Sequence, residues 1–373
     1  MPAPFQVVIA GHLCLDIIPT FSAEAGRDDP LPAPGQLRQV GPALVATGGP
    51  VSNVGLALHR LGIGTRLVGK VGDDALGRVV LELIRAHDPE LAAGIVVAPG
   101  QATSYSIVLN LPDRDRSFLH CPGANDTFCA ADLKMDEIAP GRLFHFGYPP
   151  IMARMYQGGG SELAAVLHAA KELNLTTSLD MAMVDPDSPA GQADWQAILR
   201  TALPSVDLFL PSIEETLLLL WRSEFDRLAG RGPLLAQITL PLLHELSTTL
   251  LGWGAKMVGF KMGRRGMYLR TAGAGRLAEL GKAAPANLQS WGDREIWSPV
   301  FQVTQVHGTT GAGDATIAGF LAALLRGCSP EETLTFACAV GACSVQAADA
   351  LSGIRTWEET WQRIRAGWTR AAL

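Results

Sequence analysis

Residues 308–316 read GTTGAGDAT, and this stretch separates two patterns of different period. Before it, residues 301–306 (FQVTQV) are rich in β-branched side chains, which favours a strand. After it, Ala315 to Leu325 is an almost unbroken apolar run, which predicts a buried helix. A strand, a glycine turn and a helix in this order present the backbone N–H groups of the helix start to a ligand. The stretch therefore predicts an anion-binding turn.

The turn combines an open backbone with one carboxylate. Its unpaired N–H groups would belong to Ala312, Gly313 and Asp314, at the positive end of the helix dipole. Gly311 and Gly313 carry no Cβ, so a phosphate can approach the backbone closely. Asp314 allows two interpretations. It could simply complement the helix dipole, or it could hold a substrate hydroxyl beside a phosphoryl group and accept its proton.

The rest of the chain alternates short apolar runs with amphipathic segments. A strand is expected at 7–10, followed by a helix that Ser52 or Asn53 caps and that stops at Gly62. Further strands are expected at 66–71, 143–146, 176–179 and 208–210, and further helices at 162–173 and 195–203. This alternation predicts an α/β fold with a mostly parallel central sheet sandwiched by helices. Two excursions interrupt it, a helical one at 222–254 and a loop-like one at 273–298.

Two other segments do not follow the alternation. Residues 13–46 begin as a strand and become rich in proline and glycine, and residues 101–121 resemble a hairpin around a charged turn. We expect these segments, about 13–46 and 101–121, to form a small β-sheet lid outside the main layers.

A second glycine cluster, Thr47 to Asn53, lies where the first long helix begins. Gly48 and Gly49 leave room for a ligand against the backbone, and the Asn53 amide can both donate to and accept from hydroxyls. Asp16 follows an apolar strand, where its carboxylate could accept from two vicinal hydroxyls. The alternatives are an ordinary glycine turn with an Asn cap and a solvated turn carboxylate.

Other site classes fit the sequence poorly. Residues 64–70 match most of a Walker A loop, but Val71 stands where a Ser or Thr must hold magnesium. The GAGD turn lacks the third glycine of the dinucleotide fingerprint. The eight histidines and six cysteines show no metal-ligand spacing.

Composition narrows the partners further. The 30 basic and 36 acidic residues give a net charge of −6, which disfavours nucleic acid as a partner. The apolar run after Asp314 is far shorter than the roughly 20 residues that span a bilayer, so no membrane partner is expected. The N-terminus has no basic residue before its short apolar run, and the cysteines form no paired motif, so a cytoplasmic protein is expected.

Taken in order, these segments resemble the PfkB or ribokinase-like carbohydrate kinases. The GAGD region is similar to the C-terminal signature of that family, and Thr47 to Asn53 together with residues 56–58, 61–62 and 68–77 is similar to its N-terminal signature. Similar landmarks lie between them at 122–125 (PGAN), 178–180 (SLD), 211–215 (PSIEE) and 261–266 (KMGRRG). The resemblance covers about the whole chain.

The resemblance implies roles for individual residues. Asp314 matches the general base, and Gly311, Ala312 and Gly313 match the anion hole. The sugar-side positions are Asp16, Gly48, Gly49 and Asn53, and the nucleotide-side positions are Lys261, Gly263, Gly266 and Cys338. Ser212 and Glu215 fall on an Asn-x-x-Glu motif linked with magnesium and phosphate. Three positions differ from the family pattern: Ser212 replaces that Asn, Gly308 stands where many relatives have Asp, and Cys338 stands where an Asn often borders the adenine pocket.

The resemblance implies a ribokinase-like kinase domain over residues 1–373. We expect transfer of the ATP γ-phosphate to a sugar or sugar acid, with Mg²⁺ bridging the phosphates, and a homodimer through the lid. Two alternatives stay open: a nucleoside kinase on the same fold and a non-catalytic protein that binds sugar or nucleotide.

Overall fold

An eight-stranded sheet forms the centre of the fold in the computed structural model, which describes residues 5–21, 34–111 and 116–371. Its strands, in spatial order, are β14 (Glu295–Ser298), β13 (Met267–Thr271), β12 (Met257–Lys261), β11 (Leu208–Phe209), β10 (Thr176–Leu179), β9 (Leu143–Gly147), β1 (Val7–Gly11) and β4 (Thr65–Val68). All neighbours from β4 to β12 are parallel, and β13 and β14 join antiparallel at one edge. The expected mostly parallel sheet is therefore confirmed.

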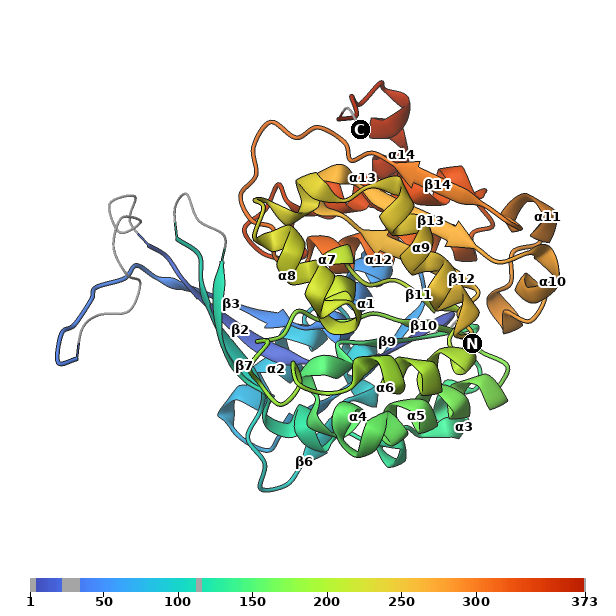
Figure 1. The fold of residues 1–373 in the computed structure, drawn as a ribbon. Helices are drawn as coiled ribbons and strands as arrows, with labels where there is room; N and C mark the ends of the chain where they lie inside the picture. The colour runs from blue at the N-terminus through green and yellow to red at the C-terminus, as the bar shows by residue number, and fades with distance from the viewer. Residues whose placement is uncertain (1–4, 22–33, 112–115, 372–373) are drawn as a thin grey trace.

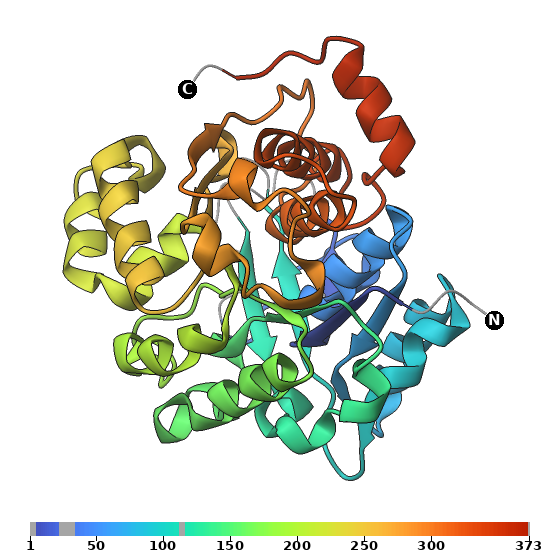
Figure 2. The same cartoon turned by 90° about the vertical axis from the view of Figure 1, so that its right-hand side faces the viewer.

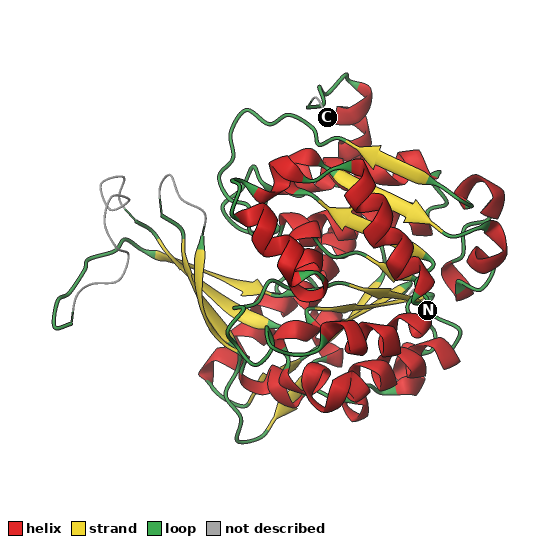
Figure 3. Ribbon diagram, viewed as in Figure 1, coloured by secondary structure: helices red, strands yellow, loops and turns green. Residues whose placement is uncertain are grey.

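Helices cover both faces of this sheet (Figures 2 and 3). On one face, α1 (Pro50–Arg60), α12 (Ala312–Leu325) and α13 (Pro330–Ser344) pack against one another, while α5 (Ser161–Glu172), α6 (Trp195–Ala202) and α9 (Leu240–Gly252) cover the other. The remaining helices are α2 (Ala75–Arg85), α3 (Met135–Ile138), α4 (Ala153–Tyr156), α7 (Ile213–Leu220), α8 (Arg222–Ala229), α10 (Ala274–Leu277), α11 (Leu288–Trp291) and α14 (Trp357–Arg365). Helix α12 is apolar on every side because it is wedged between α1 and α13.

A smaller four-stranded sheet projects from one side of the molecule (Figure 1). It consists of β3 (Ala43–Gly48), β2 (Cys14–Pro19), β7 (Tyr105–Leu109) and β8 (Ser117–Cys121), in that order. The pairs β2–β3 and β7–β8 are antiparallel, and β2–β7 is parallel. These strands come from the two segments expected to form the lid, although residues 22–33 and 112–115 of those segments lie outside the described residues.

Two expected boundaries near the N-terminus were wrong. Helix α1 begins at Pro50 rather than after Ser52 or Asn53, because proline at the first helical position loses no hydrogen bond and already has a helical φ. The strand expected at 66–71 is divided at Gly69 into β4 and β5 (Lys70–Gly72), and β5 pairs with β6 (Val96–Ala98) in a separate two-stranded sheet.

Two expectations near the C-terminus were also wrong. The run 301–306 is not a strand: only Phe301 makes a bridge, and its partner is Arg370 near the end of the chain. The excursion 273–298 is not a loop, because it contains α10, α11 and the edge strand β14. The two errors are related, since β14 occupies the sheet edge that 301–306 would have needed. The helical excursion at 222–254 is confirmed by α8 and α9.

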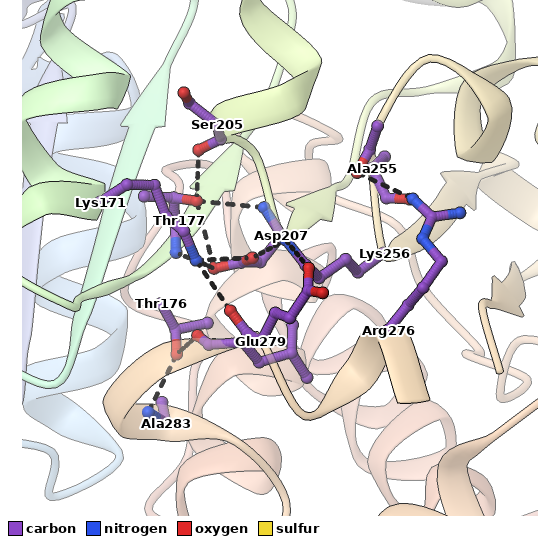
Figure 4. Close-up of polar contacts among 12 residues, drawn as sticks. Lys171, Thr176, Thr177, Ser205, Asp207, Ala255, Lys256, Arg276, Glu279 and Ala283 are labelled. Atoms are coloured by element: carbon purple, nitrogen blue, oxygen red, sulfur yellow. Dashed lines mark hydrogen bonds and ion pairs between the residues drawn. The ribbon is translucent and has the colours of Figure 1, made fainter. Parts of the chain in front are cut away.

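The amino-terminal ends of β10, β11 and β12 are tied together by one buried carboxylate (Figure 4). Asp207, which is fully buried, accepts from Lys171 Nζ at 2.8 and 2.9 Å and from Lys256 Nζ at 2.9 Å. It also accepts from the backbone N–H of Thr177 at 2.9 Å. Two ammonium groups and a backbone donor therefore compensate for the cost of burying this charge.

Candidate functional site

The opposite, carboxyl-terminal edge of the sheet carries several polar side chains. His12 follows β1, Tyr148 follows β9, Asp180 follows β10, and Lys261 is the last residue of β12. Ligands of open parallel sheets bind beyond this edge. Here the structure has a cavity of about 1490 Å³, lined by His12, Tyr148 and Lys261 together with the start of α12 and the inner side of the small sheet.

Asp314, in the first turn of α12, lines this cavity. Its side chain is 1% exposed. Asn53 Nδ2 on α1 donates to Asp314 Oδ2 at 2.8 Å, and the Tyr148 hydroxyl donates to the two carboxylate oxygens at 2.9 and 3.0 Å. Burial raises the pKa of Asp314, although the Lys261 ammonium and these hydrogen bonds counteract part of the increase. Three distant segments of the chain therefore converge on one carboxylate.

The turn before Asp314 has the expected backbone. Gly311 precedes the helix with φ of 71°, and a Cβ there would lie 2.3 Å from the Ala350 Cβ, so only glycine fits. The three expected amides are not equivalent, however. Ala312 N–H donates to the Thr309 carbonyl at 3.2 Å, whereas Gly313 and Asp314 occupy first-turn positions whose amides have no carbonyl partner within a helix.

The expected sugar-side residues come from β2, β3 and the start of α1. Asp16 is 7% exposed, and burial raises its pKa to about 6, while hydrogen bonds from Cys14 and Ser106 lower it. Gly49 has φ of 83° and lies against the His12 backbone. Among the expected site residues, all of which are described, only Gly48 does not line the cavity. A Cβ at Gly48 would lie 2.4 Å from Asp16 Oδ2, so this glycine leaves room for the carboxylate.

Lys261, expected on the nucleotide side, lies next to the glycine turn that precedes α12. Its Nζ donates to Asp180 Oδ1 at 2.8 Å, and a Cβ built at Gly313 would lie 3.5 Å from the same nitrogen. Burial alone would lower the pKa of Lys261, but Asp180, Glu215 and Asp314 raise it. Burial raises the pKa of Asp180 to about 8, with Glu215 and Asp314 adding to the increase and Lys261 opposing it. Three carboxylates thus share one ammonium.

Ser212 and Glu215 form a capping box at the start of α7. Ser212 N–H donates to Glu215 Oε2 at 2.7 Å, and Glu215 N–H donates to Ser212 Oγ at 3.1 Å. The replacement of the motif's asparagine by Ser212 therefore has a structural explanation, because serine caps a helix as well as asparagine does. Both residues line the cavity, and burial raises the pKa of Glu215.

The expected nucleotide-side residues line one end of the cavity. A Cβ at Gly266 would lie 2.0 Å from the Ser298 carbonyl oxygen, and φ at Gly266 is 87°. Cys338 on α13 donates from Sγ to the same carbonyl at 3.6 Å, and burial raises its pKa to about 11. Gly263 also lines this end, as do the small residues Gly341 and Ala342 of α13.

Sequence reasoning missed Tyr148 and did not assign a role to Asp180. Asp180 directly follows the strand predicted at 176–179, and Tyr148 lies two residues after the strand predicted at 143–146. Polar residues just beyond strands of a parallel sheet were the available signal. Within residues 5–21, 34–111 and 116–371, no group of three His, Cys, Asp or Glu side chains is arranged to hold a metal ion. Helices long and apolar enough to cross a membrane are also absent from this part of the chain.

The curated proteins that this chain resembles include several sugar kinases. The curated protein "Fructokinase-2" of Solanum lycopersicum is 24% identical over 371 residues, which cover 97% of this chain and 96% of that protein. An uncharacterized sugar kinase of Archaeoglobus fulgidus is 26% identical over 279 residues, with coverages of 74% and 89%.

Two solved structures show the same fold. Arabidopsis thaliana ribokinase complexed with ribose and ATP has a TM-score of 0.71 at 20% identity, covering 96% of this chain and 98% of that one. Xylella fastidiosa fructokinase with bound ATP has a TM-score of 0.69 at 20% identity, with coverages of 96% and 98%. The profile of the pfkB family carbohydrate kinases matches residues 7–357. Because that match spans nearly the whole chain, the protein belongs to the pfkB family of carbohydrate kinases, which are phosphotransferases with an alcohol acceptor.

Proposed function

We propose that the protein transfers the γ-phosphate of ATP to a hydroxyl of a sugar or sugar acid, with Asp314 as the base. One observation carries the proposal: Asp314 is 1% exposed and lies between the anion-binding turn and the sugar-side residue Asn53. A carboxylate that only complements a helix dipole has no need to be buried, because it is more easily accommodated in water. Burial in a cavity is expected for a group that contacts substrate.

Asp314 would orient the substrate hydroxyl rather than ionise it in advance. A carboxylate is far too weak a base to deprotonate a free alcohol, even with its pKa raised by burial. In a loose phosphoryl-transfer transition state the proton can move late, after bond formation to phosphorus has begun. The hydrogen bonds from Asn53 and Tyr148 fix the carboxylate, and Oδ1, which accepts from Tyr148 alone of these two, retains a lone pair for the substrate.

The phosphoryl group would lie over the start of α12. The N–H groups of Gly313 and Asp314 are the available donors of the expected anion hole, with Gly311 and Ala312 shaping the turn. Lys261, whose Nζ lies beside Gly313, adds a positive charge at the same place. Such preorganised donors stabilise the charge that develops during transfer.

Asp16 would bind the hydroxyls of the substrate that do not react. With a pKa of about 6, it is mostly ionised at neutral pH and can accept from two vicinal hydroxyls. Gly49 and Asn53 complete this side of the proposed site. Fructose is the first substrate to test, because several curated relatives carry the name fructokinase.

The residues present fit a magnesium ion bound mainly through ATP. Mg²⁺ in kinases is held by one or two carboxylates, by phosphates and by water. Asp180 Oδ2 is buried with no hydrogen-bond partner among the described residues, next to the Oδ1 that accepts from Lys261, and Glu215 lines the cavity. Asp180 and Glu215 would therefore hold the ion, which would neutralise charge on the phosphates when bound.

The small sheet would exclude water from the reaction. Arg116 Nη2 at the start of β8 donates to Thr309 Oγ1 at 2.6 Å, so the sheet already contacts the segment that leads into the anion-binding turn. Exclusion of water matters because water competes with the sugar as a nucleophile. The outer strands of this sheet expose Leu44, Val45, Phe118 and Leu119, which supports a homodimer through the lid.

A nucleoside is the second candidate acceptor. Phe118 and Met183, about half exposed, line the cavity, and such apolar walls suit a base better than a hydroxyl-rich ring. A coupled assay of ADP release over sugars, sugar acids and nucleosides separates the candidates, with Asp314→Asn as the negative control. If none of these acceptors supports ADP release, the proposed kinase activity is contradicted and a binding protein is favoured.

A further inference from the structure

Beyond the anion-binding turn, the cavity continues into a compartment with mostly apolar walls. One wall consists of Cys338, Gly341 and Ala342 of α13 and of Val345, which follows the end of that helix. The facing wall consists of residues 300–303 and Ala371. Compartments with apolar walls suit a planar ring system. If the phosphates of ATP lie at the turn, as proposed above, its base lies here, so the inference below rests on the proposed function.

The facing wall is not supported by the central sheet. Residues 300–306 follow β14 but continue no strand, and their backbone partners come from the C-terminal tail, which we define as residues 368–371. Gln302 N–H donates to the Thr369 carbonyl at 2.9 Å, and Ala371 N–H donates to the Val300 carbonyl at 2.8 Å. Figure 2 shows the tail leaving α14 and crossing this end of the molecule. The tail therefore supports the wall as a neighbouring strand would.

Side chains reinforce the same contact. Trp368 stacks on Phe301 with ring centres 4.6 Å apart, and its indole N–H donates to the Gln302 carbonyl at 2.6 Å. Phe301 is 3% exposed because Arg370 covers its ring, with the guanidinium carbon 4.6 Å from the ring centre. The wall is thus held between two side chains of the tail.

Arg370 also hydrogen-bonds to residues on both sides of the compartment. One guanidinium nitrogen donates to Ser298 Oγ at the end of β14, at 2.7 Å, and another donates to Thr335 Oγ1 on α13, also at 2.7 Å. Since α13 forms the opposite wall, one planar side chain connects both sides of the compartment. The fork of an arginine suits this task because it presents several donors in a fixed geometry.

We propose that the C-terminal tail sets the width of the nucleotide-base compartment, with Arg370 as its positioning residue. The tail then determines affinity and selectivity for the base and has no effect on the sugar. Arg370 contacts neither the phosphates nor the acceptor; it acts through residues 300–303 and α13. Ala371 itself lines the compartment, so the end of the tail forms part of the surface that faces the base.

The first test compares two altered chains with the full chain in calorimetric binding of a non-hydrolysable ATP analogue. One chain ends after Gly367, and the other carries Arg370→Gln, which keeps the length of the side chain but removes its fork. We expect the dissociation constant for the analogue to rise about tenfold in both, as expected for losing one wall of apolar contact. The preference for adenine over guanine analogues should fall, and the Michaelis constant for the sugar should stay unchanged.

Arg365→Gln is the matched control, because Arg365 is an exposed arginine of α14 whose ring contact, with Trp361, lies outside the compartment. It should bind the analogue like the unaltered chain. An analogue affinity within twofold of the unaltered value in Arg370→Gln would overturn the proposal.

A second measurement uses the unaltered protein, so it does not depend on whether the shortened chain folds. Trypsin can cleave after Arg370, and the magnesium complex of the analogue should slow that cleavage while sugar should not. Cleavage at an equal rate with and without analogue would overturn the proposal. If the unaltered protein does not bind the analogue at all, both the proposed function and the role of the tail are refuted. If it binds the analogue but the tail variants bind equally well, only the role of the tail is refuted.

Discussion

Replacing Asp314 with Asn separates its two interpretations, because the variant keeps the shape of the side chain and removes its basicity. The Asn carbonyl can still accept from Asn53 Nδ2, which donates to Asp314 at 2.8 Å. The new amide would face the Tyr148 hydroxyl, which can rotate its proton away and accept instead. The variant also no longer buries a charge. We therefore expect the free energy of unfolding to change by only about 1 kcal/mol.

The effect on catalysis should be much larger. Loss of a general base costs about 10²- to 10⁴-fold in rate, which corresponds to roughly 3–5 kcal/mol of activation free energy. The assay is single-turnover phosphoryl transfer at saturating ATP and sugar, together with calorimetric affinities for both ligands. Tyr148→Phe is the comparison variant, because it removes one hydrogen bond but keeps the carboxylate, and its rate should fall by about tenfold or less. A folded Asp314→Asn protein with near-normal transfer would refute Asp314 as the base.

Three further predictions concern other parts of the molecule. Burial raises the pKa of Asp16 to about 6, so the folded state binds this proton more tightly than the unfolded chain, and stability should fall as pH rises from about 4 to 6. Asp16→Asn should remove this decrease in the free energy of unfolding, which is on the order of 2–3 kcal/mol, as measured by urea unfolding at pH 4 and pH 7.5. The same variant should bind the sugar more weakly and ATP with unchanged affinity. Because Gly308 supplies no carboxylate to a monovalent ion, a potassium titration at constant ionic strength should change the rate only weakly, and steep activation would contradict this. Asp207→Asn should leave the Lys171 ammonium without its counter-charge and Lys256 with only the Glu279 carboxylate at 3.9 Å, which should lower the free energy of unfolding by about 3–5 kcal/mol in urea titration.

The sequence predicted those elements whose signals are local. The strands β1 and β9 are short, mostly apolar runs buried along their whole length, and α12 follows a turn in which only glycine fits at position 311. Residues 301–306 have the same β-branched composition as a strand, but composition carries no information about which sheet edges are free. In the structure β14 takes that edge, although its sequence, Glu-Ile-Trp-Ser, gives only a weak alternating signal.

Some residues of the candidate site could likewise be predicted from local sequence signals, and others could not. Asp314, Asp16 and Asn53 could be chosen from the sequence because glycines flank them or strands precede them. Tyr148 could not, because its contribution depends on a left-handed backbone, with φ of 64°, that turns its hydroxyl toward Asp314. Such a conformation in a residue other than glycine is uncommon, and no short sequence pattern predicts it. The tail contact with residues 300–303 is equally nonlocal, since nearly seventy positions separate its partners.

Buried carboxylates are neutralised at the amino-terminal end of the parallel strands but not fully at the carboxyl-terminal end. This difference indicates which end binds a ligand. At the amino-terminal end, Asp207 lies between Lys171 and Lys256, so its charge is more than balanced within the protein. At the carboxyl-terminal end, Asp180, Glu215 and Asp314 share the ammonium of Lys261. Burial raises the pKa of each carboxyl group, and repulsion by neighbouring carboxylates adds to the increase at Asp180 and Glu215. An excess of buried negative charge destabilises a fold that holds it alone. It becomes favourable when a cation joins it, as magnesium with ATP would in the proposed reaction. The protein should therefore melt at a higher temperature with Mg²⁺ and an ATP analogue together than the separate effects of the two would give.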